Sequence, residues 1–265
     1  MPITTKEPLI RLPQKEFAEI AYEVTNKAFA IRKELGPLFD EFVYKRALLQ
    51  CFPNALSECR IDVAFEDFHK AYFIDFILKP GAIFELKATQ TLTDRHRSQL
   101  LHYLLLTEMN HGKLINFSPQ KVEHTFINTY LTHADRIAFA VNESNWHPTA
   151  GFNQDHQTRI LNMLSDWGSC LNLELYQEAI IHMTRGKNQA LREVHVFQND
   201  KCIAHQVMPL CDEETILHVT TLPNKASNYT NKLTRMLHAT KRKHAQWINI
   251  SRKTITFQTL TNKTK

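Results

Sequence analysis

The sequence predicts an α/β protein made of two tandem copies of one unit, each with the element order αβββαβ around a mixed central sheet. Three observations predict this class. Helical and strand-like periodicities alternate in that order through the N-terminal half, the pattern returns after 132 to 133 residues, and 43% of the residues are hydrophobic, as in globular proteins. Only 6 Gly and 10 Pro leave little room for a long flexible linker.

Each element of the first copy has its own signal. The first helix carries an apolar stripe from Ala18 to Ile31, and Leu35-Gly36-Pro37 ends it. Apolar runs between turn residues predict the strands. The further elements are a helix over about 40–50, strands over 60–65, 72–78 and 83–89, a helix over 94–108, a strand over 113–116 and an extended run over 122–127. This order predicts an α/β sandwich.

The second copy is visible as a repeat. With a shift of 132 residues, Gly36, Tyr44 and Ala47 meet Gly168, Tyr176 and Ala179. With a shift of 133, seven identities connect the last helix and strand: Leu100, Leu104, Thr107, His111, Ile115, Asn116 and Ser118 meet Leu233, Leu237, Thr240, His244, Ile248, Asn249 and Ser251. We therefore predict two domains, residues 1–148 and 149–265, with a connector near 145–155.

A charged set interrupts two apolar strands of the first copy. Asp75 lies in the second predicted strand, and Glu85 and Lys87 lie two residues apart in the third. Residues i and i+2 of a strand share a face, and the turn at Pro80-Gly81 brings Asp75 to the same patch. Two carboxylates and an ammonium are costly to bury among apolar residues unless something uses them. Hard oxygen ligands of this kind suit Mg²⁺, which keeps water molecules for chemistry.

The second copy lacks this set. Under the 133-residue shift, the three charged positions become Met208, His218 and Thr220. The strands and the last helix persist without the charges, so the fold does not need them. Chemistry is the natural reason for their presence in the first copy.

The C-terminal end is strongly basic. The net charge is +5, but no Asp or Glu follows Glu214, and the residues after it contribute +10. These residues are Lys225, Lys232, Arg235, Lys241, Arg242, Lys243, Arg252, Lys253, Lys263 and Lys265. A polyanionic partner would select such an end, with Lys241, Arg242 and Lys243 as candidate nucleic-acid contacts. A solvated basic surface is the alternative.

Cysteine usage and hydropathy favour a reducing compartment. Five cysteines without a CxxC pair argue against a disulfide framework or a zinc knuckle. The first residues lack the apolar core of a signal sequence, and the longest apolar stretch, near 100–106, is far too short for a membrane span. We therefore expect a cytoplasmic protein without a membrane partner.

An ordered set of motifs runs through the first copy. The motifs are Leu35-Gly36-Pro37, Glu41-Phe42-Val43-Tyr44, Ala47-Leu48, Ile74-Asp75-Phe76, Phe84-Glu85-Leu86-Lys87-Ala88, His96, Gln99-Leu100-Leu101, Tyr103-Leu104 and Leu114-Ile115-Asn116-Phe117. This set resembles the PD-(D/E)XK nuclease superfamily, which has the restriction-endonuclease-like fold, and more narrowly its GxxExxY-type bacterial proteins. The resemblance spans about residues 17–130, and the second copy keeps a degenerate form of it. Leu38 and Ala30 depart from the pattern, where the family has a Gly and a Glu.

The resemblance implies roles for five of these residues. Asp75 and Glu85 would bind a metal ion, Mg²⁺ or Mn²⁺, and Glu41 would add a helix-borne carboxylate to the metal site. Lys87 would orient or activate the attacking water, and Gln99 would be a supporting polar group. Phosphodiester hydrolysis needs charge neutralisation at phosphorus and a hydroxide-like nucleophile, which a bound cation and a nearby ammonium supply.

Some of these residues have a structural alternative. Glu85 and Lys87 alone would usually be a solvated ion pair. His96 either contacts phosphate or caps its helix. Tyr44 and Tyr176 occur in both copies, which favours packing or capping over catalysis.

The resemblance predicts a metal-dependent nuclease that hydrolyses phosphodiester bonds in nucleic acid, and we expect the nucleic acid to be DNA. One alternative is a non-catalytic nucleic-acid-binding or accessory module with a vestigial nuclease fold; another is a protein-interaction scaffold. The second copy would hold the polyanion or mimic a second subunit. We therefore expect a monomer with an internal pseudo-dimer in preference to an obligate homodimer.

Overall fold

The computed structural model describes residues 3–79, 81–223 and 227–262. The chain forms two compact units, Met1–His133 and Ala134–Lys265. Pro80 of the predicted turn, and Lys225, Lys263 and Lys265 of the predicted basic end, lie outside the described residues. No helix in the described part of the chain is long and apolar enough to cross a membrane.

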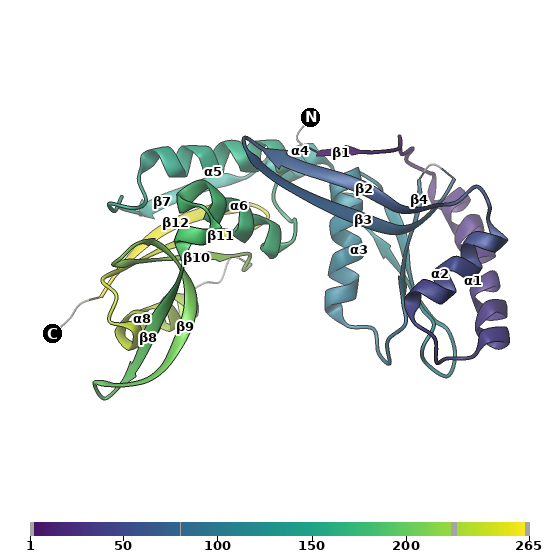
Figure 1. The fold of residues 1–265 in the computed structure, drawn as a ribbon. Helices are drawn as coiled ribbons and strands as arrows, with labels where there is room; N and C mark the ends of the chain where they lie inside the picture. The colour runs from purple at the N-terminus through teal and green to yellow at the C-terminus, as the bar shows by residue number, and fades with distance from the viewer. Residues whose placement is uncertain (1–2, 80, 224–226, 263–265) are drawn as a thin grey trace. The chain divides into compact units, whose positions relative to one another are not determined.

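The first unit is a mixed sheet with helices on both faces (Figure 1). Its described strands pair in the order β1-β2-β3-β4-β5-β6. The strands β4 and β5 run parallel and are connected through α3, whereas the other pairs are antiparallel. The elements are β1 (Ile3–Thr5), α1 (Gln14–Leu35), α2 (Glu41–Cys51), β2 (Leu56–Phe65), β3 (Phe68–Leu78), β4 (Ala82–Lys87), α3 (Asp94–Thr107), β5 (His111–Asn116) and β6 (Glu123–Asn128).

Strand alternation decides which side chains of β4 reach which helical layer. Phe84 and Leu86 are buried in one core with the apolar faces of α1 and α2. The helix α3 packs on the opposite face of the sheet (Figure 1). Because successive strand side chains point to opposite faces, Glu85 and Lys87 project on the α3 side. The hydrophobic pattern of β4 therefore places two charged groups on the face away from α1.

The turn between α1 and α2 has the same construction in both units. Gly36 has φ +77° and ends α1, and the buried Tyr44 donates a hydrogen bond of 2.6 Å to its carbonyl oxygen. In the second unit Gly168 has φ +78°, and Tyr176 donates a bond of 2.6 Å to its carbonyl oxygen. A left-handed backbone at this point favours glycine. Both tyrosines therefore serve the turn, as the sequence predicted.

The second unit has a sheet in the order β7-β12-β11-β10-β9-β8 within the described residues. β10 and β11 run parallel and are connected through α8, like β4 and β5 of the first unit. The elements are α4 (His133–Ile137), β7 (Ala140–Asn145), α5 (Gln154–Trp167), α6 (Leu173–Arg185), α7 (Lys187–Ala190), β8 (Leu191–Gln198), β9 (Lys201–Asp212), β10 (Thr215–Thr220), α8 (Ser227–Thr240), β11 (His244–Ile250) and β12 (Thr254–Thr261).

The boundary between the two compact units follows His133, earlier in the sequence than the predicted boundary after residue 148. The strand β7 pairs in parallel with β12, so Ala140–Asn145 belongs to the second sheet. Its side chains are exposed throughout, which leaves no apolar alternation to indicate a strand. The short β1 was also not predicted. It pairs with β2 and forms one edge of the first sheet.

The short helices α4 and α7 were not predicted either, whereas the other elements of the first unit agree with the sequence. The structure confirms the α/β class and the αβββαβ order in the first unit, with restriction-endonuclease-like architecture. The predicted strands 60–65 and 72–78 are longer than expected, because β2 and β3 form one long hairpin from Leu56 to Leu78.

Candidate active site

The site lies where β3 separates from β4. The ladder between the two strands runs from Leu78–Ala82 to Phe76–Phe84. Past the Phe76–Phe84 pair, the Leu86 amide of β4 no longer bonds to the backbone of β3. It donates a hydrogen bond of 3.0 Å to Oδ2 of the Asp75 carboxylate instead. The sheet therefore opens into a fork, and Asp75 is held in the fork beside Glu85.

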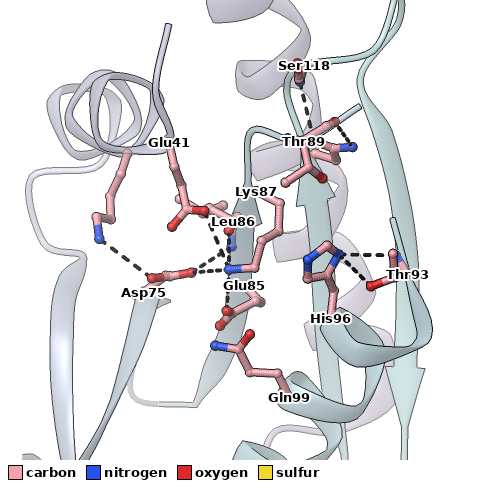
Figure 2. A network of polar contacts seen from close by, with 12 residues as sticks. Glu41, Asp75, Glu85, Leu86, Lys87, Thr89, Thr93, His96, Gln99 and Ser118 are labelled. Carbon is pink, nitrogen blue, oxygen red and sulfur yellow. Dashed lines mark hydrogen bonds and ion pairs between the residues drawn. The ribbon is translucent and has the colours of Figure 1, made fainter. Parts of the chain in front are cut away.

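Lys87 lies at the centre of the acidic groups. Its Nζ is 2.7 Å from Glu85 Oε1 and 3.6 Å from Asp75 Oδ2. It is also 3.6 Å from Glu41 Oε2 at the start of α2, and it donates a bond of 2.8 Å to the Leu86 carbonyl oxygen. Figure 2 shows these side chains pointing toward one another from α2, β3 and β4. The structure thus brings together four of the predicted site residues.

Glu85 is the most buried member of this group. It is 0% exposed, and its Oε2 has no hydrogen-bond partner among the described residues. Burial, followed by the charge of Asp75, raises the pKa of Glu85 to about 8, although Lys87 opposes the shift. A buried carboxylate oxygen without a donor is an acceptor that a cation would satisfy.

The other two charged groups respond to the same crowding. Burial, with the nearby Asp75, raises the pKa of Glu41 against the opposing effect of Lys87. Burial alone would lower the pKa of Lys87, but the charges of Glu85, Asp75 and Glu41 raise it. The ammonium is therefore firmly charged, and the carboxylates around it favour any further positive charge.

Lys45 belongs to the site and was not predicted. Its Nζ lies 3.6 Å from Asp75 Oδ1 and also pairs with Glu58 of β2. Burial would lower the pKa of Lys45, but its pairing with Glu58 and Asp75 raises it. Lys45 is four residues after Glu41 on α2, so both face the site. That spacing was the signal available in the sequence.

Gln99 and His96 enter from α3. Gln99 Nε2 donates a bond of 3.1 Å to the Tyr103 hydroxyl, and Figure 2 shows its side chain directed toward Glu85. His96 caps α3, because its Nδ1 accepts a bond of 3.2 Å from the Thr93 amide. Burial and the charge of Lys87 lower the pKa of His96. Of the two predicted roles for His96, the capping contact is thus present.

Asn116 stabilises the end of the site strand. Its Oδ1 accepts a bond of 3.0 Å from the Thr89 amide, and its Nδ2 donates a bond of 2.8 Å to the Thr89 carbonyl. Asn249 makes the corresponding contacts with Leu222, at 2.8 and 3.1 Å. The amide clamp is therefore common to both units and independent of the charged set.

The group is not a finished metal site. Within the described residues, no three His, Cys, Asp or Glu side chains are arranged around a common metal position. The Lys87 ammonium contacts Glu85 Oε1 and the Leu86 carbonyl oxygen, two hard oxygen ligands that a metal ion would otherwise use. The oxygen-only donor set and the unpaired Glu85 Oε2 fit a divalent cation such as Mg²⁺ or Mn²⁺.

Neutral groups fill the corresponding positions of the second unit. His218 Nε2 lies 2.8 Å from the Tyr229 hydroxyl, and Thr220 Oγ1 accepts a bond of 2.8 Å from the Trp247 indole. Gln177, which corresponds to Lys45, donates a bond of 3.2 Å to the Val219 carbonyl. A cavity of about 350 Å³ lies beside His218 and Met208. These contacts contain no carboxylate, so the described residues of this unit do not form an acidic cluster like that of the first.

The predicted basic contacts are paired within the second unit. Lys241 Nζ lies 2.8 Å from Asp200 Oδ1 and over the Phe197 ring. Lys243 Nζ lies 2.5 Å from Glu214 Oε1, and Arg242 donates to the Glu213 carbonyl. Part of the positive charge at this end is therefore used locally.

Comparison with known proteins finds a family similarity that lies in the first unit. No curated protein matches the chain. A solved structure described as the crystal structure of SSO0001 matches with 20% identity and a TM-score of 0.28, over 44% of this chain and 64% of that chain, so less than two thirds of it is spanned. Residues 18–128 match the sequence model of the PD-(D/E)XK nuclease superfamily, and this range contains the whole acidic cluster. Over these residues the first unit is therefore similar to the PD-(D/E)XK nuclease superfamily.

Proposed function

We propose that the first unit is a divalent-metal-dependent nuclease that hydrolyses phosphodiester bonds in DNA. One observation carries the proposal. Three carboxylates, Glu41, Asp75 and Glu85, contact the Lys87 ammonium, and the most buried of them has an oxygen without a hydrogen-bond donor. Lys45 pairs with one of the three, Asp75. Such an excess of acceptors is expensive in a buried site unless a cation completes it.

The proposed division of labour follows from the positions of the groups. Asp75 and Glu85, with Glu41 and the Leu86 carbonyl, would hold the metal. A bound Mg²⁺ or Mn²⁺ would supply an acidified water and stabilise negative charge on the phosphate. Lys87 would hold the attacking water and the charged phosphate oxygens through its N–H groups. Gln99 would orient the Glu85 carboxylate from α3.

We infer that the second unit is a degenerate copy of the first without chemistry of its own. The matched tyrosine–glycine turns and asparagine clamps support a common origin, and the neutral groups at Thr220 and His218 support the loss of the site. One chain would then supply both units as an internal pseudo-dimer, and a second chain would not be needed. The exposed cations of the second unit, Lys241 and Lys243, would add weak attraction for a polyanion.

A cleavage assay tests the proposal. Labelled DNA and RNA substrates are incubated with the protein in Mg²⁺, Mn²⁺ or EDTA, and products are separated on a gel. The variant Asp75→Asn keeps the acceptor for Leu86 but loses the charge, and Asp62→Asn, an exposed aspartate of β2, is its matched control. We expect metal-dependent cleavage of DNA that falls by about 100-fold or more in Asp75→Asn and stays unchanged in Asp62→Asn. Equal cleavage by both variants would rule out the assignment.

A second function is favoured by one observation. Lys87 already contacts all three carboxylates, and the described residues contain no preformed metal group. A binding or accessory module would keep its affinity for nucleic acid in EDTA, lose it steeply with salt and form no product. The same assay, read for binding as well as cleavage, separates the two functions.

A further inference from the structure

Large apolar side chains are exposed beside the acidic site. Leu38, Phe39 and Phe42, which surround the start of α2, are 92%, 48% and 62% exposed, and Phe73 of β3 is 46% exposed. Leu38, Phe39 and Phe42 are close neighbours in the chain, and exposed apolar patches usually mark binding sites. We call these four residues the aromatic rim.

The rim is continuous with the site on its α2 side. Glu41 and Lys45 face the acidic cluster, since their side chains contact Lys87 and Asp75. Phe42 and Arg46 are each one residue further along the helix, so they form the neighbouring stripe. The Arg46 guanidinium lies 5.7 Å from the centre of the Phe42 ring. An aromatic face and a cation therefore stand next to Glu41.

Phe73 contributes to the rim from the sheet. Its neighbour Tyr72 packs against His102 and Tyr103 of α3, so Phe73 points to the opposite face of β3. It also lies beyond Phe76–Phe84, the last pair before β3 separates from β4. The ring two residues before Asp75, that of Phe73, is therefore exposed and not part of the core.

The chemistry of the rim selects one kind of partner. Rings with an adjacent arginine are the combination on which nucleobases stack, and the arginine also attracts the phosphate backbone. In a duplex the base faces are covered by their neighbours, whereas an unpaired strand presents them. An apolar protein surface would not explain why cations and the acidic cluster are interleaved with the rings.

We infer that the aromatic rim stacks unpaired bases, so that the site acts on single-stranded or frayed nucleic acid in preference to intact duplex. This inference rests on the proposed nuclease function, because it assigns the substrate of the same site. Stacking beside Glu41 and Asp75 would place the adjoining phosphate next to the metal-binding carboxylates.

The test measures binding apart from cleavage. Fluorescence anisotropy in EDTA compares three probes of equal length: a labelled single-stranded DNA, its duplex, and a single strand with abasic sites, which keeps the phosphates but lacks base faces. The variants are Phe42→Ala and Phe73→Ala, and the matched control is Tyr22→Ala, an exposed aromatic on α1. Circular dichroism confirms the fold of each variant.

We expect the single strand to bind about tenfold or more tightly than the duplex or the abasic strand, and each rim variant to weaken it by about 5- to 150-fold, the range for one stacked base. Tyr22→Ala should bind like the wild type. Equal binding of the abasic strand or the duplex, or no effect of the rim variants, would overturn the inference and leave the rim as a protein contact. Duplex cleavage that requires Asp75 would then keep the nuclease proposal. Single-strand binding without any cleavage would remove the nuclease and keep the stacking.

Discussion

The Lys87 ammonium donates a hydrogen bond of 2.7 Å to Glu85 Oε1, two residues earlier on the same strand. Glu85 is fully buried, so this contact compensates a charge that the protein interior would otherwise reject. Lys87 also reaches Asp75 and Glu41 at 3.6 Å. It acts as an internal counter-ion of the cluster, and any added cation must share the oxygens with it.

The stability of the metal-free protein should fall as pH rises. Glu85 has a pKa of about 8 in the folded protein, against 4.5 as its ordinary value. Between these values the folded protein keeps a proton that the unfolded chain has lost, so the free energy of unfolding decreases with pH and levels off above about 8. Glu85→Gln carries no ionisable group and should become more stable than the wild type over this interval.

Urea unfolding at several pH values, followed by circular dichroism, measures this effect. Trp146, Trp167 and Trp247 are the three tryptophans of the chain and lie in the second unit. Their fluorescence therefore reports that unit and serves as an internal control that Glu85→Gln should not change. A wild-type stability that is flat or increases from pH 5 to 8 would contradict the prediction.

Removal of the internal counter-ion should separate metal binding from cleavage. In Lys87→Met, three carboxylates lose their ammonium, so Mn²⁺ should bind at least as tightly as in the wild type, whereas cleavage should fall by about 100-fold or more. Calorimetric titration measures the first quantity and the gel assay the second. Because Lys87 opposes the upward shift of the Glu85 pKa, its removal should raise that pKa further and extend the fall of stability with pH in the metal-free variant.

Lys113→Met is a matched control for this variant. Lys113 is 3% exposed in β5, its ammonium lies over the Phe126 ring, and burial lowers its pKa. It is a buried lysine outside the acidic cluster, so its replacement should leave Mn²⁺ binding and cleavage unchanged. Loss of Mn²⁺ binding in Lys87→Met alone would assign Lys87 to the structure of the site and not to the reaction.

The two turn tyrosines should behave as structural equivalents. Tyr44→Phe and Tyr176→Phe each remove a hydrogen bond of 2.6 Å donated to a glycine carbonyl, and with it the bond that the hydroxyl accepts from a backbone amide of the same turn. Each should destabilise its own unit by about 1–3 kcal/mol, because the carbonyl loses its donor. Tryptophan fluorescence should shift only for Tyr176→Phe. Tyr44→Phe should retain cleavage at a temperature where the unit is folded, and a large loss of activity there would give Tyr44 a role in the chemistry.

The sequence predicted those parts of the site that depend on local geometry. Glu85 and Lys87 were expected to share a face because a strand repeats every two residues, and they do. Asp75 was expected near them because a short turn joins its strand to theirs. The distance between Asp75 and the Leu86 amide depends on where the ladder stops, and no periodicity records that point.

Other features depend on contacts between distant segments. Asn116 reaches Thr89, 27 residues earlier, only after β5 has paired with β4. The basic composition of the C-terminal end includes Lys241. Its ion-pair partner, Asp200, is 41 residues earlier, on the hairpin of β8 and β9. Composition gives the sign of a charge, whereas its availability to a ligand depends on the neighbours that folding brings.

The asparagine clamp gives the two sheets a shared reference point. Since Asn116 and Asn249 fasten matching backbone segments, the units can be superposed on them without reference to any acidic residue. Under the proposed duplication, Met208 and His218 occupy the positions of Asp75 and Glu85. Carboxylates grafted there one at a time would reveal how much of the reactivity resides in charge and how much in the framework that carries it.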